Sequence, residues 1–434
     1  MSLLEHAKAK ALLAEAVLTP ASIRHCQEHL RQFLQRYLPL FYRDEQRELA
    51  TVVLQGRLSG LERKTSEPIA ALAGRHRKPV QHFVGAGRWD DAAVLAELRR
   101  HVAAELGDSD AVLVLDSSGF PKRGAESCGV ARQWCGRLGK VDNCQVGVFL
   151  SYAAPGGHAP LDCRLYLPAD WAGDRKRRRK THVPKEVAFQ EQWRIGLDLL
   201  DRSGPDVPHA WVGADDAFGR VTDFRAELRL RGERYVLDVP SNTRVRALAE
   251  RPGGRRPAFE RADAWARRQP VRRWKTITLR AGAQGPLKVR ALKARVQTKD
   301  DGGHVGPGET LVVIRSLGAD ARTWYAVSNA RRQERLHRLV AAHGERHRVE
   351  EVLQEGKGEV GLGQYEVRSW VGWHHHMTLA LLALWFLAQE RRRLGGKNAG
   401  PDGGAAAAGV QPAAARPAAG PRADRRGSQP GAAA

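Results

Sequence analysis

Cysteine is scarce in this chain, and the few copies are not spaced as a metal site or a disulfide framework would require. The 434 residues include five cysteines, and no two of them form a CxxC pair. An odd number without such pairing favours a reduced, cytosolic protein. It also argues against a zinc site built from cysteine and histidine.

Long hydrophobic runs are missing as well. The longest apolar stretch covers residues 377–388, whereas a helix needs about 20 apolar residues to cross a bilayer. This stretch is therefore typical of a buried helix. The first residues combine Leu/Ala helical periodicity with charges throughout, which is unlike a signal peptide. We expect a cytoplasmic protein that does not enter a membrane.

Acidic residues are too few to balance the basic ones. The chain has 71 Lys and Arg against 48 Asp and Glu, a formal net charge of +23. A positive charge of this size is typical of proteins that bind nucleic acid. The densest basic run occupies residues 175–180. Such a run is either a phosphate-binding segment or a solvated patch.

Two short apolar segments lead directly into an aspartate. Asp116 follows residues 111–115, whose length and β-branched content are typical of a strand buried on both faces, and a turn is predicted directly after it. Asp215 follows residues 210–214 in the same way, and a helical pattern comes next. Carboxylates at the ends of two strands of one sheet can lie close together. The alternative is that each aspartate only caps the element that follows.

A third carboxylate lies on a predicted helix. In residues 343–357, Arg346, Glu350 and Lys357 recur at helical spacing, which places them on one face. A solvated helix with an Arg–Glu ion pair would show the same spacing, and spacing alone favours that interpretation.

Taken together, these segments resemble the bacterial insertion-sequence transposases of the DDE class, in the group whose glutamate lies in a Y-(2)-R-(3)-E-(6)-K signature. Here the signature is His343, Arg346, Glu350 and Lys357, with every spacing kept and histidine in place of tyrosine. Further segments resemble the family at residues 115–122, 131–136, 139–145, 214–219 and 357–376. The resemblance extends from about residue 81 to residue 387.

The resemblance implies an α/β fold, namely an RNase H-like mixed sheet flanked by helices and interrupted by a β-rich insertion. We expect an N-terminal helical region that binds DNA or supports packing at 1–107. The catalytic core is expected at 108–240 and 331–392, the second part carrying the glutamate helix. The insertion is expected at 241–330, and a disordered Ala/Gly/Pro-rich tail at 393–434.

The resemblance also implies the chemistry. Asp116, Asp215 and Glu350 would be the catalytic residues and would hold two Mg²⁺ or Mn²⁺ ions, with Asp116 bridging them, since oxygen ligands suit such cations. Two ions assist both the attacking and the leaving oxygen of a phosphodiester. Without metal, three converging carboxylates should raise one another's pKa values. Asp216 leaves open which carboxylate of its pair coordinates, and we favour Asp215.

The implied partner is double-stranded DNA, both the terminal inverted repeats of a transposon and the target, bound by a homodimer near the nucleoid. Arg346 and Lys357 would hold phosphates beside the reacting one, and His343 could donate to a phosphate. The basic run would be a loop near the site that binds DNA phosphates; it comprises Arg175, Lys176, Arg177, Arg178, Arg179 and Lys180.

The implied activity is metal-dependent hydrolysis at transposon ends, followed by transfer of the exposed 3′-hydroxyl strand to target DNA. Two alternatives remain open. One is an inactive or domesticated derivative that only binds DNA, and the other is an RNase H-like endonuclease without strand transfer. In the predicted insertion, Trp274 and Trp324 could stack on bases, although core packing is favoured for both.

Overall fold

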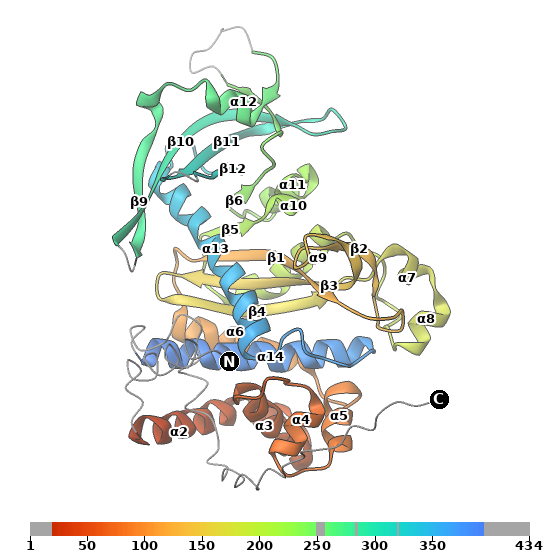
Figure 1. Cartoon of the computed structure of the whole chain (residues 1–434). Coiled ribbons are helices and arrows are strands. Elements are labelled where there is room, and N and C mark those ends of the chain that lie inside the picture. The colour runs from red at the N-terminus through yellow and green to blue at the C-terminus, as the bar shows by residue number, and fades with distance from the viewer. Residues whose placement is uncertain (1–19, 249–256, 283–284, 319–320, 395–434) are drawn as a thin grey trace, which may run out of the picture.

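The computed structural model describes residues 20–248, 257–282, 285–318 and 321–394. The predicted tail therefore lies outside the described residues, apart from residues 393 and 394. Figure 1 shows a central sheet with helices on both faces, the N-terminal helices below it, and long curved strands at the opposite end. This arrangement confirms the predicted α/β class and its N-terminal helical region.

One mixed sheet of twelve strands runs through the described part of the chain, in the order β2-β3-β1-β5-β6-β12-β11-β10-β7-β8, with β4 on β3 and β9 on β10. The strands β1 and β5 pair in parallel, and so do β5 and β6, whereas β1 and β3 are antiparallel. This mixture is consistent with an RNase H-like fold. The bounds are β1 Val112–Pro121, β2 Ala131–Cys135, β3 Lys140–Ala154, β4 Gly157–Leu165, β5 Trp211–Ala214, β6 Tyr235–Asp238, β7 Arg244–Ala247, β8 Glu260–Arg261, β9 Lys275–Gly282, β10 Gly285–Lys299, β11 Val305–Ser316 and β12 Thr323–Ser328.

The strands of the predicted insertion extend the same sheet. The strand β12 pairs antiparallel with β6, with Val327 opposite Leu237, and β11 and β10 follow outward from β12. Trp274 and Trp324 are half-buried and pack against the hydrophobic core. The curved strands β9 to β12 therefore continue from the edge of the parallel strands, as Figure 1 shows.

Helices surround the sheet. Near the N-terminus they are α2 Pro20–Tyr37, α3 Asp44–Leu58, α4 Ser66–Leu72, α5 Arg77–Gly85 and α6 Asp91–Leu106. The middle of the chain forms α7 Ala169–Gly173, α8 Arg175–Lys180, α9 Gln192–Ser203, α10 Asp216–Gly219, α11 Thr222–Leu230 and α12 Ala262–Arg267. Two long helices follow, α13 Leu336–Glu359 and α14 Trp370–Arg393.

The helix α14 contains the longest apolar run of the sequence and is the centre of the lower half of the molecule. It packs against β4 and α6 on one side and against α3 and α5 on the other (Figure 1). Its apolar side chains are consequently buried almost throughout. The prediction of a buried helix is confirmed, and none of the described helices is long and apolar enough to cross a membrane.

The helix α13 carries the predicted glutamate across the sheet. It contacts β1, β3 and β5 as well as the curved strand β9, and it meets α14 near its C-terminal end (Figure 1). Val352 and Leu353 are buried. Their packing fixes which face of α13 looks toward the sheet, and therefore where the polar side chains around residue 350 can lie.

Candidate active site

The two predicted aspartates lie side by side because of the strand register. In the parallel β1–β5 pair, Leu115 is opposite Ala214, so Asp116 and Asp215 each follow the last matched residue. The prediction of a turn directly after Asp116 was wrong. The strand β1 continues to Pro121 because residues 117–121 pair with residues 144–148 of β3. Asp116 therefore marks the end of the β1–β5 pairing within a longer strand.

Asp215 has two roles at once. Its Oδ1 accepts hydrogen bonds from the backbone N–H groups of Ala217 at 3.1 Å and Phe218 at 3.4 Å, as an N-cap of α10. The same residue lines a cavity with Asp116. The capping interpretation is therefore compatible with the site interpretation, since the cap orients the carboxylate while the cavity remains open beside it.

The cavity brings together residues from distant parts of the sequence. It has a volume of about 1270 Å³, and Asp116, Asp215, Glu350 and Lys357 all line it. A hairpin from β2 and β3 contributes its other wall with Gln133, Trp134 and Arg137. The structure thus places all three predicted carboxylates and one of the two predicted phosphate-binding cations around one space.

Burial dominates the electrostatics of the two aspartates. Burial, followed by the negative charge of Asp215, raises the pKa of Asp116 to about 7, although a hydrogen bond from Ser117 N–H at 2.7 Å opposes this. Burial also raises the pKa of Asp215, against the hydrogen bond from Phe218. Mutual repulsion was expected to raise these pKa values; in the structure desolvation is the larger cause.

Glu350 is held differently. Its side chain is 55% exposed, and its Oε1 lies 3.2 Å from Nη1 of Arg346, one helical turn earlier. Arg346 also approaches Asp238, with Nε 2.9 Å from Oδ2. Burial lowers the pKa of Arg346, and the surrounding carboxylates, Asp238 first, more than offset it, so the pKa lies above its usual value.

Asp238 is a site residue that sequence reasoning missed. It ends β6, whose Leu237 is opposite Ala214 of the parallel strand β5, so Asp215 and Asp238 are also matched. Besides Arg346, its carboxylate meets His343, with His343 Nε2 2.8 Å from Asp238 Oδ1. His343, the residue in the tyrosine position, is only 4% exposed. A signal was present, because residues 235–237 are an apolar run before an aspartate, as at Asp116 and Asp215.

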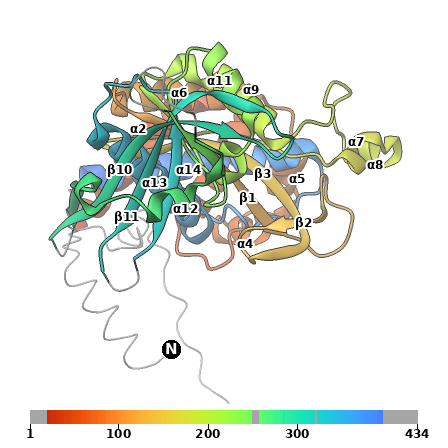
Figure 2. The same ribbon diagram turned by 90° about the horizontal axis from the view of Figure 1, so that it is seen from above.

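The basic run at 175–180 is a helix, which corrects the prediction of a loop. Asp174 caps α8 by accepting from Arg177 N–H at 2.9 Å. Arg178 donates to backbone carbonyls of Pro184 and Val187 at 2.8 and 2.7 Å. None of these six described side chains lines the carboxylate cavity. Figures 1 and 2 both place α7 and α8 at one edge of the molecule.

The donor set suits a hard divalent cation, because it consists of carboxylate oxygens alone. Asp116 and Asp215 are both half-buried, and desolvation raises the pKa of each carboxyl, so a bound cation would favour their ionised forms. Nevertheless, among the described residues no three Asp, Glu, His or Cys side chains are grouped closely enough to hold a metal ion. Holding a cation would therefore require the three carboxylates to draw closer together.

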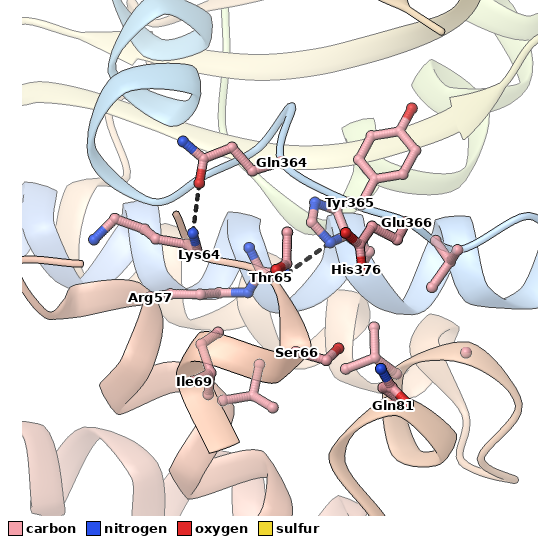
Figure 3. Close-up of a pocket in the computed structure, with 14 residues that line it drawn as sticks. Arg57, Lys64, Thr65, Ser66, Ile69, Gln81, Gln364, Tyr365, Glu366 and His376 are labelled. Atoms are coloured by element: carbon pink, nitrogen blue, oxygen red, sulfur yellow. Dashed lines mark hydrogen bonds between the residues drawn. The ribbon is translucent and has the colours of Figure 1, made fainter. Parts of the chain in front are cut away.

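A second, smaller cavity of about 260 Å³ lies between α3, α4, α5 and the segment before α14 (Figure 3). Arg57 crosses it and donates to the carbonyl of Val360 at 2.9 Å and to Nδ1 of His376 at 2.8 Å. The backbone N–H of Lys64 donates to Gln364 at 2.6 Å. These contacts connect the N-terminal helices to the end of α13.

Comparison with known proteins agrees with this geometry. A family model described as "DDE superfamily endonuclease" matches residues 36–286, which is more than half of the chain and includes Asp116 and Asp215. A curated relative, "Probable transposase for insertion sequence element IS701" from Microchaete diplosiphon, is 30% identical over 149 residues, or 34% of this chain and 39% of that protein. The chain therefore matches well under two thirds of the relative. On the family match, the chain belongs to the DDE superfamily endonucleases.

Proposed function

We propose that this protein is the transposase of a bacterial insertion sequence. It hydrolyses phosphodiester bonds at the transposon ends and then transfers the exposed 3′-hydroxyl strand to target DNA. The observation that carries this proposal is the shared cavity of Asp116, Asp215 and Glu350 in a DDE superfamily endonuclease. The name of the relative from Microchaete diplosiphon points the same way.

Divalent cations are the cofactor expected for this family, and we propose that Asp116, Asp215 and Glu350 would hold two Mg²⁺ or Mn²⁺ ions. When bound, such a pair activates the attacking oxygen and stabilises the leaving one. Asp116 in β1 and Asp215 directly after β5 contribute by being half-buried at matched positions of two adjacent strands, so that their separation is set by the sheet. Glu350 contributes by exchanging its ion pair with Arg346 for a place beside them.

The cations of α13 have separate roles in this proposal. Lys357 lines the cavity and would hold a phosphate next to the reacting one. Arg346 would hold another phosphate, which requires it to turn from Asp238 and Glu350. His343 is buried and its imidazole contacts the carboxylate of Asp238. In this proposal His343 orients Asp238 and helps to pack α13 against β6.

Double-stranded DNA is the proposed partner, with a homodimer bringing two transposon ends together near the nucleoid in the cytoplasm. The N-terminal helices would bind end sequences, and the net charge of +23 would draw the backbone to the protein. In α8, the exposed Arg175, Lys176 and Arg179 would contact phosphates outside the cavity. Arg177 and Lys180 already pair with Asp174 and Glu126.

The proposal is tested by incubating the protein with a labelled duplex that carries the repeats flanking its gene, with Mg²⁺ or Mn²⁺. Glu350→Gln is the diagnostic variant. Glu227→Gln is a matched control, since Glu227 is also on a helix, is paired with an arginine four residues away and is 40% exposed, and it does not line the cavity. Nicked ends and joined products that vanish only in Glu350→Gln are expected.

Other results select the alternatives. Nicking without joined products would identify an endonuclease without strand transfer. Binding without either product would identify an inactive, DNA-binding derivative. Products that persist in Glu350→Gln would show that the third carboxylate has been assigned wrongly.

A further inference from the structure

The hairpin formed by β2 and β3 presents an exposed tryptophan at the rim of the carboxylate cavity. All eleven tryptophans of the chain lie in the described ranges, and ten of them are buried or half-buried. Trp134 is the exception, with 63% of its surface exposed, and it lines the same cavity as Asp116, Asp215 and Glu350. An exposed indole of this kind is a large apolar surface in contact with water.

The hairpin itself is firmly built, so the exposure is not a consequence of a loose segment. Its turn is closed by N–H groups of Leu138 and Gly139, which donate to the carbonyl of Cys135 at 2.9 and 3.0 Å. Gly139 has φ 62°, a left-handed conformation that favours glycine. Cys135 is buried against Cys144 and Val146. Alternation along β2 then turns Trp134 outward while Cys135 points inward.

Positive charge accompanies the indole. Arg137, at the tip of the hairpin, lines the cavity together with Lys357 of α13. Burial first, and then the like charge of Arg137, lowers the pKa of Lys357. Two cations facing one space favour an anionic occupant between them. Arg132 and Lys140, also on the hairpin, are exposed.

We propose that Trp134 stacks on a nucleobase adjacent to the reacting phosphodiester, and that Arg137 contacts the phosphate beside that base. An aromatic face with neighbouring cations is the usual means of binding unpaired bases, because every base offers a π-face. Stacking would remove the indole from water and hold the strand across the carboxylates. The base must be unpaired, since a base within a duplex already has stacked neighbours. This inference deepens the proposed function and rests on it for the reaction, but its test requires binding alone.

The test measures the affinity of the full chain for a fluorescent single-stranded oligonucleotide and for an oligonucleotide of the same length with abasic positions. The wild type should bind the base-containing strand about tenfold more tightly, which is the scale of one stacked base. Trp134→Ala should lose this preference, and Trp134→Phe should retain most of it. Phe189→Ala is the control, because Phe189 is an aromatic residue that is 43% exposed and does not line the cavity. Arg137→Gln should weaken the binding of both oligonucleotides by the same factor.

Several outcomes would overturn the inference. One is an unchanged preference for bases in Trp134→Ala, and another is the absence of binding or preference in the wild type. A third is a change in oligomeric state in Trp134→Ala with the base preference intact, since the indole would then belong to a protein interface. Failure of the proposed function is distinguishable: the protein would leave duplex ends uncut while Trp134→Ala still abolished the base preference.

Discussion

The two sides of the carboxylate cavity are held in different ways. Asp116 lies in β1 and Asp215 directly follows the adjacent parallel strand β5; both are half-buried, at positions set by backbone register. Glu350 lies on the exposed surface of α13 and is held by an ion pair with Arg346. One side of the cavity is therefore prearranged by the sheet, whereas the other depends on a contact that a ligand can replace. Substitutions on the two sides should therefore separate activity from stability.

The largest effect is expected from Asp116→Asn. The amide keeps the size of the side chain but cannot provide the charge that holds a divalent cation, so end cleavage should fall by about a thousandfold or more, given several kcal/mol of transition-state stabilisation. Cleavage of a labelled end in single-turnover conditions measures this. The control is Asp216→Asn, because Asp216 is half exposed and paired with Arg220. Comparable loss in both variants would show that Asp216 takes part in the role assigned to Asp215.

Asp238→Asn should have the largest effect on stability. It removes the charge that faces Arg346, which is 13% exposed, and the partner of buried His343. Loss of one member of a buried ion pair lowers the free energy of unfolding by about 3–5 kcal/mol. Because the Asp238–Arg346 pair is partly exposed, we expect a loss of about 2–4 kcal/mol. Denaturant unfolding monitored by circular dichroism gives the value. A loss below about 0.5 kcal/mol would mean that Asp238 does not hold α13 against β6.

The pH dependence of stability should reveal the buried aspartate. Because the pKa of Asp116 is about 7 in the folded protein, its usual value being 3.8, the folded state holds this proton more tightly. The stability that this provides is complete below about pH 4 and is lost as the pH rises through about 7. In the presence of a chelator, the free energy of unfolding of Asp116→Asn should rise relative to that of the wild type by a few kcal/mol between pH 4 and pH 8. A constant difference across this range would contradict the burial of Asp116.

The smallest effect on stability is expected at Glu350. Its exposed ion pair with Arg346 should contribute only about 0.3–0.5 kcal/mol, so Glu350→Gln should unfold almost as the wild type does while losing activity. Denaturant unfolding and end cleavage on the same preparation provide both values. If the variant is strongly destabilised, its lost activity would no longer separate the two sides of the cavity.

Sequence patterns predicted the parts of this site that are local, and missed those that depend on strand pairing. The apolar runs before Asp116 and Asp215 were sufficient to predict two strands and a carboxylate at the end of each run. The same pattern precedes Asp238, but nothing local shows that β6 lies next to β5 in register. The spacing of Arg346 and Glu350 predicted their shared face, and it also predicted the ion pair that the structure contains.

Two further features could not be read from the sequence for physical reasons. The run at 175–180 was interpreted as a loop because it lies between the two aspartates in the fold that the resemblance implies, but an Asp174 cap and carbonyl partners for Arg178 support a helix. Alternation along β2 predicts that the side chains of Gln133 and Trp134 lie on opposite faces of the strand, but it does not show which face is exposed to solvent. That depends on which face packs against the rest of the protein: Cys135, on the face opposite Trp134, is buried with Cys144 and Val146.

We propose that Asp116, Asp215 and Glu350 form one divalent-metal site although Glu350 starts in contact with Arg346. This is tested most directly by titrating Mn²⁺ into the full chain and following free Mn²⁺ by electron paramagnetic resonance, for wild type, Asp116→Asn, Asp215→Asn, Glu350→Gln and the control Glu227→Gln. We predict that each of the three site variants weakens Mn²⁺ binding by at least about tenfold, as expected for loss of a carboxylate ligand, while Glu227→Gln binds as the wild type does. Wild-type affinity in Glu350→Gln would contradict the claim and leave the two strand aspartates without their third ligand.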